Sequence, residues 1–223
     1  QKDIISFILV PANNKGPKKE VFDRINNTDF NNPISNNYLT HGLHEEVSDP
    51  IIQRIKANEL NNSINDKVKI FFVPVYLNGN DGIFNIEYYD LLIGFDLTIF
   101  PSYYEPWGYT PLESIAFHIP TITTTLAGFG LWVKNKYGNK TDGVYVIERN
   151  DENDKFVCDE ISINILNFSN KSIEEQNKAR ENAFNISRTA LWNNLVVFYI
   201  KAYSWALLKV ESRSELYKEK KLI

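Results

Sequence analysis

Five short apolar runs, each bounded by proline or glycine, recur along the first two thirds of the chain. They are rich in β-branched residues, which is typical of strands in a parallel sheet, and the first is expected to be buried on both faces. They cover residues 4–10, 68–73, 96–100, 121–124 and 144–147. Between them lie segments with apolar positions at helical spacing. This alternation predicts an α/β fold with a doubly wound parallel sheet and helices on both of its faces.

Helix starts between these strands carry capping signals. Ser48-Asp49-Pro50 places a capping oxygen before a proline at the first helical position, and the helix continues through Ile51, Ile52 and Ile55. Asn85 is expected to cap a helix that carries Tyr88, and Thr110-Pro111 to open another. Residues 13–48 are polar and rich in Asn, so we expect a long loop there with at most one short helix near 18–24.

From residue 151 onward the periodicity is helical. The apolar run 195–208 is interrupted by Lys201 and Ser204 and is too short to span ~30 Å of hydrocarbon, so we expect a packed helix. Two parts are therefore expected. Residues 1–150 form a Rossmann-like sheet domain, and residues 151–223 form a helical segment that packs on it.

Composition narrows the classes of function. The chain has 223 residues with 24 basic and 28 acidic side chains, a balance that gives no electrostatic footprint for nucleic acid or an anionic membrane. The lone Cys158 cannot form a disulfide within the chain and favours a reducing compartment. The three histidines lack the spacing of metal ligands, so no metal site is expected. The sequence begins without Met and indicates a piece of a longer protein.

The segment 101–113, Pro-Ser-Tyr-Tyr-Glu-Pro-Trp-Gly-Tyr-Thr-Pro-Leu-Glu, is the strongest candidate for a site. It follows a predicted strand, and the carboxyl ends of parallel strands form the ligand crevice of such sheets. Pro106 and Pro111 stiffen the segment, while Gly108 lets backbone N–H groups approach a ligand. The segment then enters a helix N-terminus, which favours a phosphate.

Two carboxylates frame this segment. Glu105 follows the strand and Glu113 lies about one turn into the helix, so both can face one crevice. Carboxylates accept hydrogen bonds from sugar hydroxyls, so one suits a hexose and the other a ribose. The spacing alone is a weak signal. The alternatives are an ordinary first-turn acid at Glu113 and core or interface roles for the aromatics Tyr88, Tyr103, Tyr104, Trp107 and Tyr109.

The residues 101–111, together with Gly128-Phe129-Gly130, resemble the eukaryotic-type glycogen synthases, glycosyltransferase family 3. Weaker similarity extends from the opening strand through Thr40-His41-Gly42-Leu43 to the helix at 199–207. The resemblance implies the C-terminal domain of a GT-B fold. Residues 1–150 would then bind a nucleotide sugar and would be incomplete at their N-terminus, with the N-terminal domain absent from this chain.

The resemblance also implies an activity. Such enzymes extend an α-1,4-glucan, glycogen, from UDP-glucose with retention, in the cytoplasm and without a cofactor or metal. A homo-oligomer that contacts through the late helices is implied, with neither nucleic acid nor a membrane as partner. The family's diphosphate-binding Arg and Lys lie upstream of the opening strand, so this chain alone is expected to be inactive. The alternatives are another retaining GT-B transferase with a different donor or acceptor, and a non-catalytic paralogue.

Carried over by position, the resemblance makes Glu105 the catalytic residue beside the donor's reacting carbon. The other implied roles concern binding of the donor. Trp107 and Gly108 would hold glucose hydroxyls through their backbone, Tyr109 and Thr110 would approach the diphosphate, Glu113 the ribose, Tyr88 would stack on uracil, and the Tyr76 backbone would touch the base. The family's Arg-rich regulatory helix matches residues 172–188, which hold only three basic residues, so that regulation is in doubt.

Overall fold

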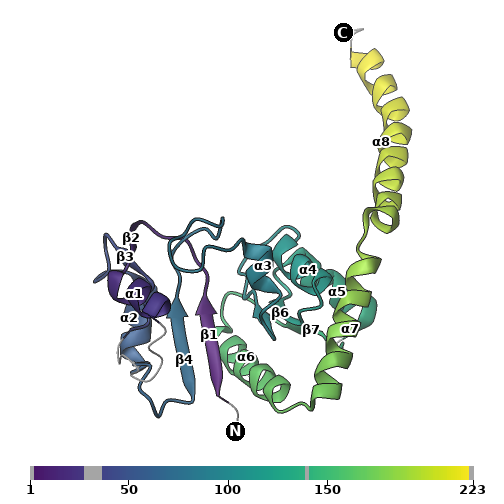
Figure 1. The fold of residues 1–223 in the computed structure, drawn as a ribbon. Helices are drawn as coiled ribbons and strands as arrows, with labels where there is room; N and C mark the ends of the chain where they lie inside the picture. The colour runs from purple at the N-terminus through teal and green to yellow at the C-terminus, as the bar shows by residue number, and fades with distance from the viewer. Residues whose placement is uncertain (1–2, 28–36, 139–140, 221–223) are drawn as a thin grey trace. The chain divides into compact units, whose positions relative to one another are not determined.

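The computed structural model describes residues 3–27, 37–138 and 141–220 (Figure 1). These residues belong to two compact units. The first comprises Gln1–Phe95 with Leu166–Asn170, and the second comprises Asp96–Ile165 with Lys171–Ile223. Each unit contains parallel strands and helices, which confirms the α/β class. The units divide between Phe95 and Asp96, whereas the expected division at residue 150 rested on the change of periodicity.

The first unit is built on two parallel strands. Strand β1 (Ile4–Ile8) pairs with β4 (Val68–Phe72), with Ile4 opposite Val68 and Ile8 opposite Phe72. Side chains alternate between the two faces of a strand. Ile8, Ile70 and Phe72 pack with helix α2 (Pro50–Ala57), while the Phe7 ring stacks on Phe71 at 5.6 Å on the other face.

The burial of β1 is less complete than its sequence predicts. Ile5 is 61% exposed, so this strand is not buried on both faces along its length. The apolar run predicts the strand correctly, because β-branched residues favour extended backbone wherever they lie. It does not report how many layers cover each side chain.

The polar segment 13–48 holds more structure than the expected loop. Helix α1 (Lys19–Asn27) agrees with the short helix predicted there, and residues 28–36 lie outside the described residues. The structure adds an antiparallel pair, β2 (Asn14–Pro17) with β3 (His41–Leu43). Asn14 Nδ2 donates to the carbonyls of Ala12 and Pro74, and Leu43 of β3 is buried in the core, so side-chain hydrogen bonds and apolar packing together hold this pair in place.

One predicted helix cap is confirmed and another is wrong. Asp49 Oδ1 accepts hydrogen bonds from the amides of Ile51 and Ile52 at the start of α2. Asn85 does not cap α3 (Tyr88–Leu92), because it has a left-handed φ of 54° and its side chain accepts from the Gly82 amide three residues upstream. Asn tolerates this conformation, which makes it a turn residue here.

The second unit contains a three-stranded parallel sheet in the order β5-β6-β7. The strands are β5 (Thr98–Ile99), β6 (Thr121–Thr124) and β7 (Val144–Ile147). Val144 and Val146 face helices α4 (Tyr109–Ala116), α5 (Gly128–Tyr137) and α7 (Ile173–Thr189). The alternate residues, Tyr145 and Ile147, face helix α6 (Asp154–Ser169). Both faces of this sheet are therefore covered by helices, as expected.

Helix α5 has no counterpart among the predicted elements. It begins with Gly-Phe-Gly, and glycine has a low helix propensity. The glycine at position 130 has a packing role instead. A Cβ there would overlap the Thr124 carbonyl oxygen, so only glycine lets α5 lie this close to β6.

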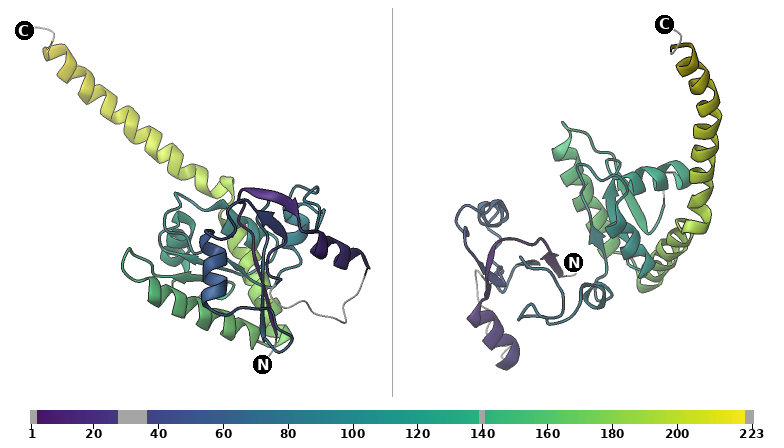
Figure 2. Two further views of the ribbon diagram at one scale, coloured as in Figure 1. Left: turned by 90° about the vertical axis from the view of Figure 1, so that its left-hand side faces the viewer. Right: turned by 90° about the horizontal axis from the view of Figure 1, so that it is seen from above.

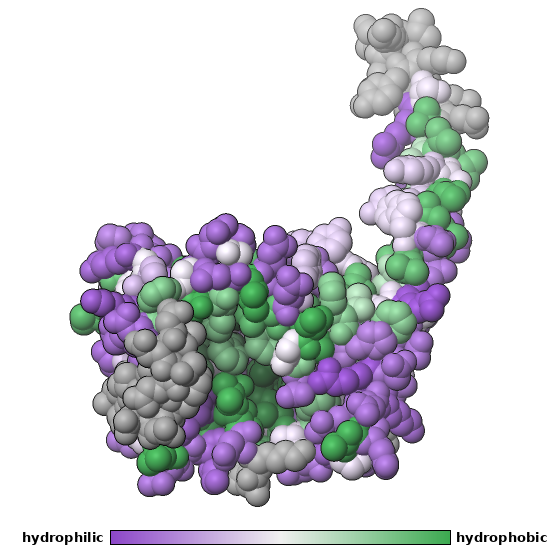
Figure 3. All heavy atoms as spheres, in the orientation of Figure 1, coloured by the Kyte–Doolittle hydropathy of each residue, from purple (hydrophilic) through white to green (hydrophobic). Residues whose placement is uncertain are grey.

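Helix α8 (Trp192–Lys220) is not the packed helix that its sequence predicts. It extends from the end of α7 (Figures 1 and 2), and Trp205 is 69% exposed. Apolar side chains gather along it in Figure 3, and they include Val197, Phe198, Tyr199, Ile200, Tyr203, Leu207 and Leu208. A helix that is apolar around its circumference is normally buried, which is why the sequence predicts a packed helix here. Among the residues that the structure describes, the side chains listed above remain exposed.

We expect Ser172→Ala to lower the free energy of unfolding by about 1 kcal/mol, since it removes the N-cap of α7. Ser172 Oγ accepts a hydrogen bond from the Glu175 amide, and this half of the capping box is lost in the variant. The other half, from the residue 172 amide to the Glu175 carboxylate, uses a backbone donor that alanine keeps. Urea denaturation followed by circular dichroism measures the change. Ser204→Ala, in the exposed middle of α8, is the matched control and should leave the midpoint unchanged. Equal midpoints for the two variants would contradict the capping role.

Candidate functional site

The loop that follows β5 fixes the backbone of Glu105 from both sides. The Glu105 amide donates to the Leu126 carbonyl at 3.1 Å, and the Glu105 carbonyl accepts from the Gly128 amide at 3.0 Å. These bonds form an isolated parallel bridge between Glu105 and Ala127. Because both peptide groups of Glu105 are engaged, its half-buried side chain leaves the backbone from a defined place near the carboxyl end of β5.

The same loop caps helix α5. The first amides of a helix need partners from outside it, and here the amides of Gly128 and Phe129 donate to the carbonyls of Glu105 and Trp107. The approach is close enough that a Cβ on Gly128 would overlap the Pro106 carbonyl oxygen. The Gly128-Phe129-Gly130 motif therefore serves the candidate site by letting loop and helix join.

Trp107 anchors the loop in the core. Its ring lies 5.9 Å from the rings of both Phe129 and Trp132, and it packs beside Leu112 in the cluster under α4 and α5. The core alternative for the aromatics thus holds for the Trp107 side chain. The ring of Trp107 is partly buried in this cluster, and the backbone of the same residue is the part that the resemblance assigns to the donor sugar.

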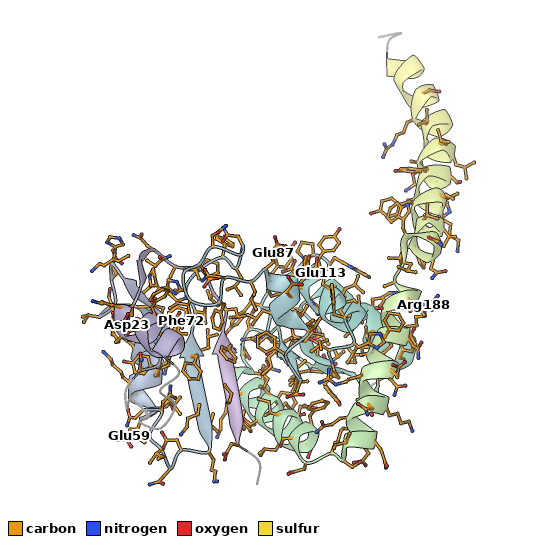
Figure 4. The ribbon with its side chains drawn as sticks, viewed as in Figure 1. Asp23, Glu59, Phe72, Glu87, Glu113 and Arg188 are labelled. Atoms are coloured by element: carbon orange, nitrogen blue, oxygen red, sulfur yellow. The ribbon has the colours of Figure 1, made fainter. Side chains whose placement is uncertain are left out.

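The start of α4 has the features expected of an anion site. Gly108 precedes the helix with a φ of 99°, a conformation that favours glycine, and within the described residues no side chain caps this helix. Tyr109 and Thr110, the first two helical residues, are exposed. Glu113 lies one turn further along α4 and is half-buried (Figure 4). The backbone amides and helix dipole at this end favour negative charge.

Two of the predicted site residues belong to the first unit. Tyr76 is 78% exposed in the segment after β4, and Tyr88 is the first residue of α3, half-buried, with its ring 5.4 Å from that of Tyr89. Within this unit, Asp81 accepts hydrogen bonds from the amides of Ile83 and Phe84 in the turn before α3. The roles of Tyr76 and Tyr88 toward a uracil base stay predictions.

A buried arginine that the sequence reading missed supports the loop from the other side. Arg149 follows β7, and its guanidinium donates from Nη1 to the Pro101 carbonyl and from Nη2 to Asp154 Oδ1, both at 2.7 Å. It also lies 3.4 Å from the centre of the Tyr103 ring. The one signal for it was its place after a predicted strand, since residues at carboxyl ends of strands tend to line the crevice.

Asp154 completes this cluster. Hydrogen bonds from the Tyr103 hydroxyl and then from Arg149 hold the pKa of the Asp154 carboxyl below its ordinary value. The same hydrogen bond to Asp154 raises the pKa of the Tyr103 hydroxyl, because the neutral phenol is the form that donates. Tyr103 is thus tied to the start of α6 and has a structural partner.

Residues 3–27, 37–138 and 141–220 lack two further features. Among these residues no group of three or more His, Cys, Asp or Glu side chains is placed to hold a metal ion. None of the helices over the same residues combines the length and the apolar character needed to cross a membrane.

Comparison with known protein families assigns the chain to a family. The profile of the family described as glycogen synthase matches residues 21–222, a range that includes the whole loop, α4 and Arg149. The chain belongs to the glycogen synthase family.

Individual relatives agree with this assignment to the glycogen synthase family. Glycogen [starch] synthase isoform 1 of Saccharomyces cerevisiae is 32% identical over 74% of this chain and 24% of its own length. The protein of the same name from Neurospora crassa is 32% identical over 76% of this chain, and the liver protein of Mus musculus is 31% identical over 72%. The chain spans about a quarter of the length of these curated relatives.

We expect Gly128→Ala to lower the free energy of unfolding of this glycogen synthase family chain by about 1–3 kcal/mol, the usual cost of overpacking. The added methyl group would collide with backbone at Pro106, which cannot move without breaking the bonds that fix Glu105. Chemical denaturation measures the change. Gly42→Ala is the matched control, because a Cβ there meets its nearest neighbour, Lys15 Cβ, at an ordinary 3.8 Å. Unfolding of Gly128→Ala and Gly42→Ala at the same midpoint would contradict the close contact between Gly128 and the Pro106 carbonyl.

We expect acid to destabilise the wild-type chain more than Asp154→Asn. A carboxyl whose pKa is lowered by folding stabilises the protein above its unfolded pKa, and this contribution is lost as the pH falls through the folded value. Asn carries no such proton linkage. Urea denaturation at a series of pH values between 6 and 3 measures the difference, which should narrow as the pH falls. A constant difference across the series would show that Asp154 is not linked to folding.

Proposed function

We propose that this chain is the C-terminal part of a retaining glucosyltransferase that extends an α-1,4-glucan, glycogen, from UDP-glucose. Its membership of the glycogen synthase family supports this proposal, as do relatives that are named glycogen [starch] synthase. The observation that carries it is Glu105, which is held through both of its peptide groups at the end of β5, directly before the open start of α4.

In this proposal the loop and α4 divide the donor between them. Glu105 lies beside the reacting carbon of glucose, where its charge stabilises the developing oxocarbenium ion. The amides near Gly108 and the start of α4 receive the diphosphate, whose negative charge they complement. Glu113, one turn along the helix, accepts from the ribose hydroxyls.

The proposed chemistry uses charge and position and needs neither a nucleophilic triad nor a metal ion. The departing diphosphate carries the negative charge, and cations that neutralise it are expected from the rest of the protein. Such cations would be an Arg and a Lys. We therefore propose that this chain requires the remaining part of the enzyme for turnover, and that it acts in the cytoplasm.

We also propose that the exposed apolar helix α8 is covered in the assembled enzyme. Side chains such as Phe198, Trp205 and Leu208 are more than half exposed, and covering large apolar side chains of this kind stabilises an assembly by roughly 25 cal/mol for each Å² removed from water. A homo-oligomer that contacts through the late helices is the arrangement proposed here.

The test uses the full-length enzyme and measures glucose transfer from UDP-glucose to glycogen. We expect Glu105→Gln to lower kcat by roughly 10²-fold, the scale for removing one electrostatic group from a transition state, while UDP binding persists. Glu113→Gln should raise the Kd for UDP about tenfold, a change of ~1.4 kcal/mol, with a smaller effect on kcat. Isothermal titration measures the binding of UDP.

Glu174→Gln is the matched control for these two variants. Glu174 is an exposed carboxylate in the first turn of α7, and its replacement should leave both kcat and the Kd for UDP unchanged. Transfer by Glu105→Gln at the wild-type rate would overturn the catalytic role. A wild-type enzyme that binds UDP but transfers no glucose would overturn the proposed activity.

A further inference from the structure

Arg149 is more completely buried than a charged side chain usually is. The residue is 9% exposed, and its guanidinium is enclosed by the Pro101 carbonyl, the Asp154 carboxylate and the face of the Tyr103 ring. Arg149 is the second residue after β7, and the groups around it come from the loop after β5 and from the first residue of α6. One planar group therefore joins the loop after β5, 48 residues away in the sequence, to the start of α6, which lies five residues beyond Arg149.

Burial of Arg149 is not expected to stabilise the fold as well as an apolar side chain in the same place would. Desolvating a guanidinium is costly, and a buried ion pair often contributes less than apolar residues of the same volume. Among the described residues, the Arg149 Nε atom has no hydrogen-bond partner, which adds to the cost. Incompletely satisfied buried charges are expected where a function requires them.

The position that Arg149 holds is the entry to the Glu105 loop. Its bond to the Pro101 carbonyl fixes the second residue after β5, and the hydroxyl of Thr124 donates to the next carbonyl, at Ser102, at 2.7 Å. The bonds between Glu105 and the 126–128 segment fix the far end. Tyr103, between these two ends, is held by its ring against Arg149 and by its hydroxyl on Asp154.

We propose that Arg149 is a positioning residue of the transferase. It acts by clamping residues 101–103 so that Glu105 is presented to the donor at one fixed place. With 6% of its side chain exposed, Arg149 is not placed to bind substrate itself, so its effect on turnover passes through the loop. This proposal rests on the proposed function of Glu105, because a clamp matters to turnover only if the clamped loop carries the catalytic group.

The clamp requires the shape of arginine as well as its charge. Two guanidinium nitrogens reach two acceptors while the plane lies against an aromatic ring, whereas an ammonium group is a single compact point that cannot do all three. Arg149→Lys is therefore expected to restore only part of what Arg149→Met loses. Tyr103→Phe keeps the ring under the guanidinium and removes only the hydroxyl bond to Asp154, so its effect should be the smallest.

The experiment measures steady-state transfer by the full-length enzyme and amide hydrogen exchange in peptides that cover residues 101–108. For Arg149→Met we expect kcat to fall by roughly 10–100-fold, the scale for a catalytic group displaced by about 1 Å, with KM for UDP-glucose nearly unchanged. Exchange in the loop should become about tenfold faster while the α7 amides keep their protection. Arg149→Lys should lie between Arg149→Met and wild type in both measurements.

Lys171→Met is the matched control. Lys171 pairs with Asp142 at 3.1 Å in the same unit but contacts no part of the loop in the described contacts, so kcat and loop exchange should stay at wild-type values. If Arg149→Met does not fold, the graded effects of Arg149→Lys and Tyr103→Phe on kcat decide the proposal. Equal losses of kcat and protection throughout the unit would indicate a merely structural arginine and overturn it.

The two proposals fail in different ways. A wild-type enzyme without transferase activity overturns the proposed function, and loop exchange then decides the clamp by itself. Wild-type exchange rates for residues 101–108 in Arg149→Met would overturn the clamp whatever the activity. Faster loop exchange together with an unchanged kcat would overturn the link between Arg149 and turnover while leaving Glu105 in its proposed role.

Discussion

The candidate site depends on one backbone interaction, the pairing of residues 105–107 with the turn that begins α5. Carbonyls of the loop satisfy helix amides that side chains satisfy elsewhere in this chain, at Asp49 and Ser172. Backbone hydrogen bonds between the loop and α5 require the two to lie close together, and the glycine at position 128 permits this. The loop and α5 therefore form a single element, and a displacement of one displaces the other.

This dependence explains how the aromatic residues of the segment are distributed. Trp107 points into the core and fixes the loop, whereas Tyr104 and Tyr109 on either side of it are 81% and 70% exposed. Gly108, with its positive φ, allows the chain to turn from a buried anchor to an exposed helix start within one residue. The motif is thus a junction between the core and a surface that a ligand can reach.

The sequence predicts the parallel strands correctly, but it misses helix α5, the conformation of Asn85 and the role of Arg149. All five parallel strands can be predicted, because β-branched runs bounded on one side by proline or glycine leave few alternatives. Helix α5 could not be predicted, because glycine normally disfavours a helix, and here Gly128 and Gly130 serve close packing. Asn85 followed a capping rule but takes a turn conformation. Arg149 was missed because a single charged residue has no periodicity, and its place after a predicted strand was the one signal for it.

The candidate site also has parts that the sequence predicts and parts that it does not. The carboxylates and the Gly108 bend could be predicted from spacing and from the chemistry of prolines and glycine. The supports could not, because Thr124 and Arg149 reach the loop from residues 22 and 48 positions away from their partners. Such contacts depend on the order of the strands, and local sequence does not determine that order.

Helix α7 shows how packing can take over a surface that resembles a regulatory one. Arg180, one of its three basic residues in the range 172–188, donates to Asp96 Oδ1 at 2.8 Å. Gly143 lies so close to α7 that a Cβ would overlap the Ala179 carbonyl oxygen, and Ala183 packs in the same cluster as Ile115 of α4. Helix α7 therefore covers the helix whose first turn is the proposed diphosphate site. A helix seated this tightly on α4 has a structural reason to be retained even where its charges are few.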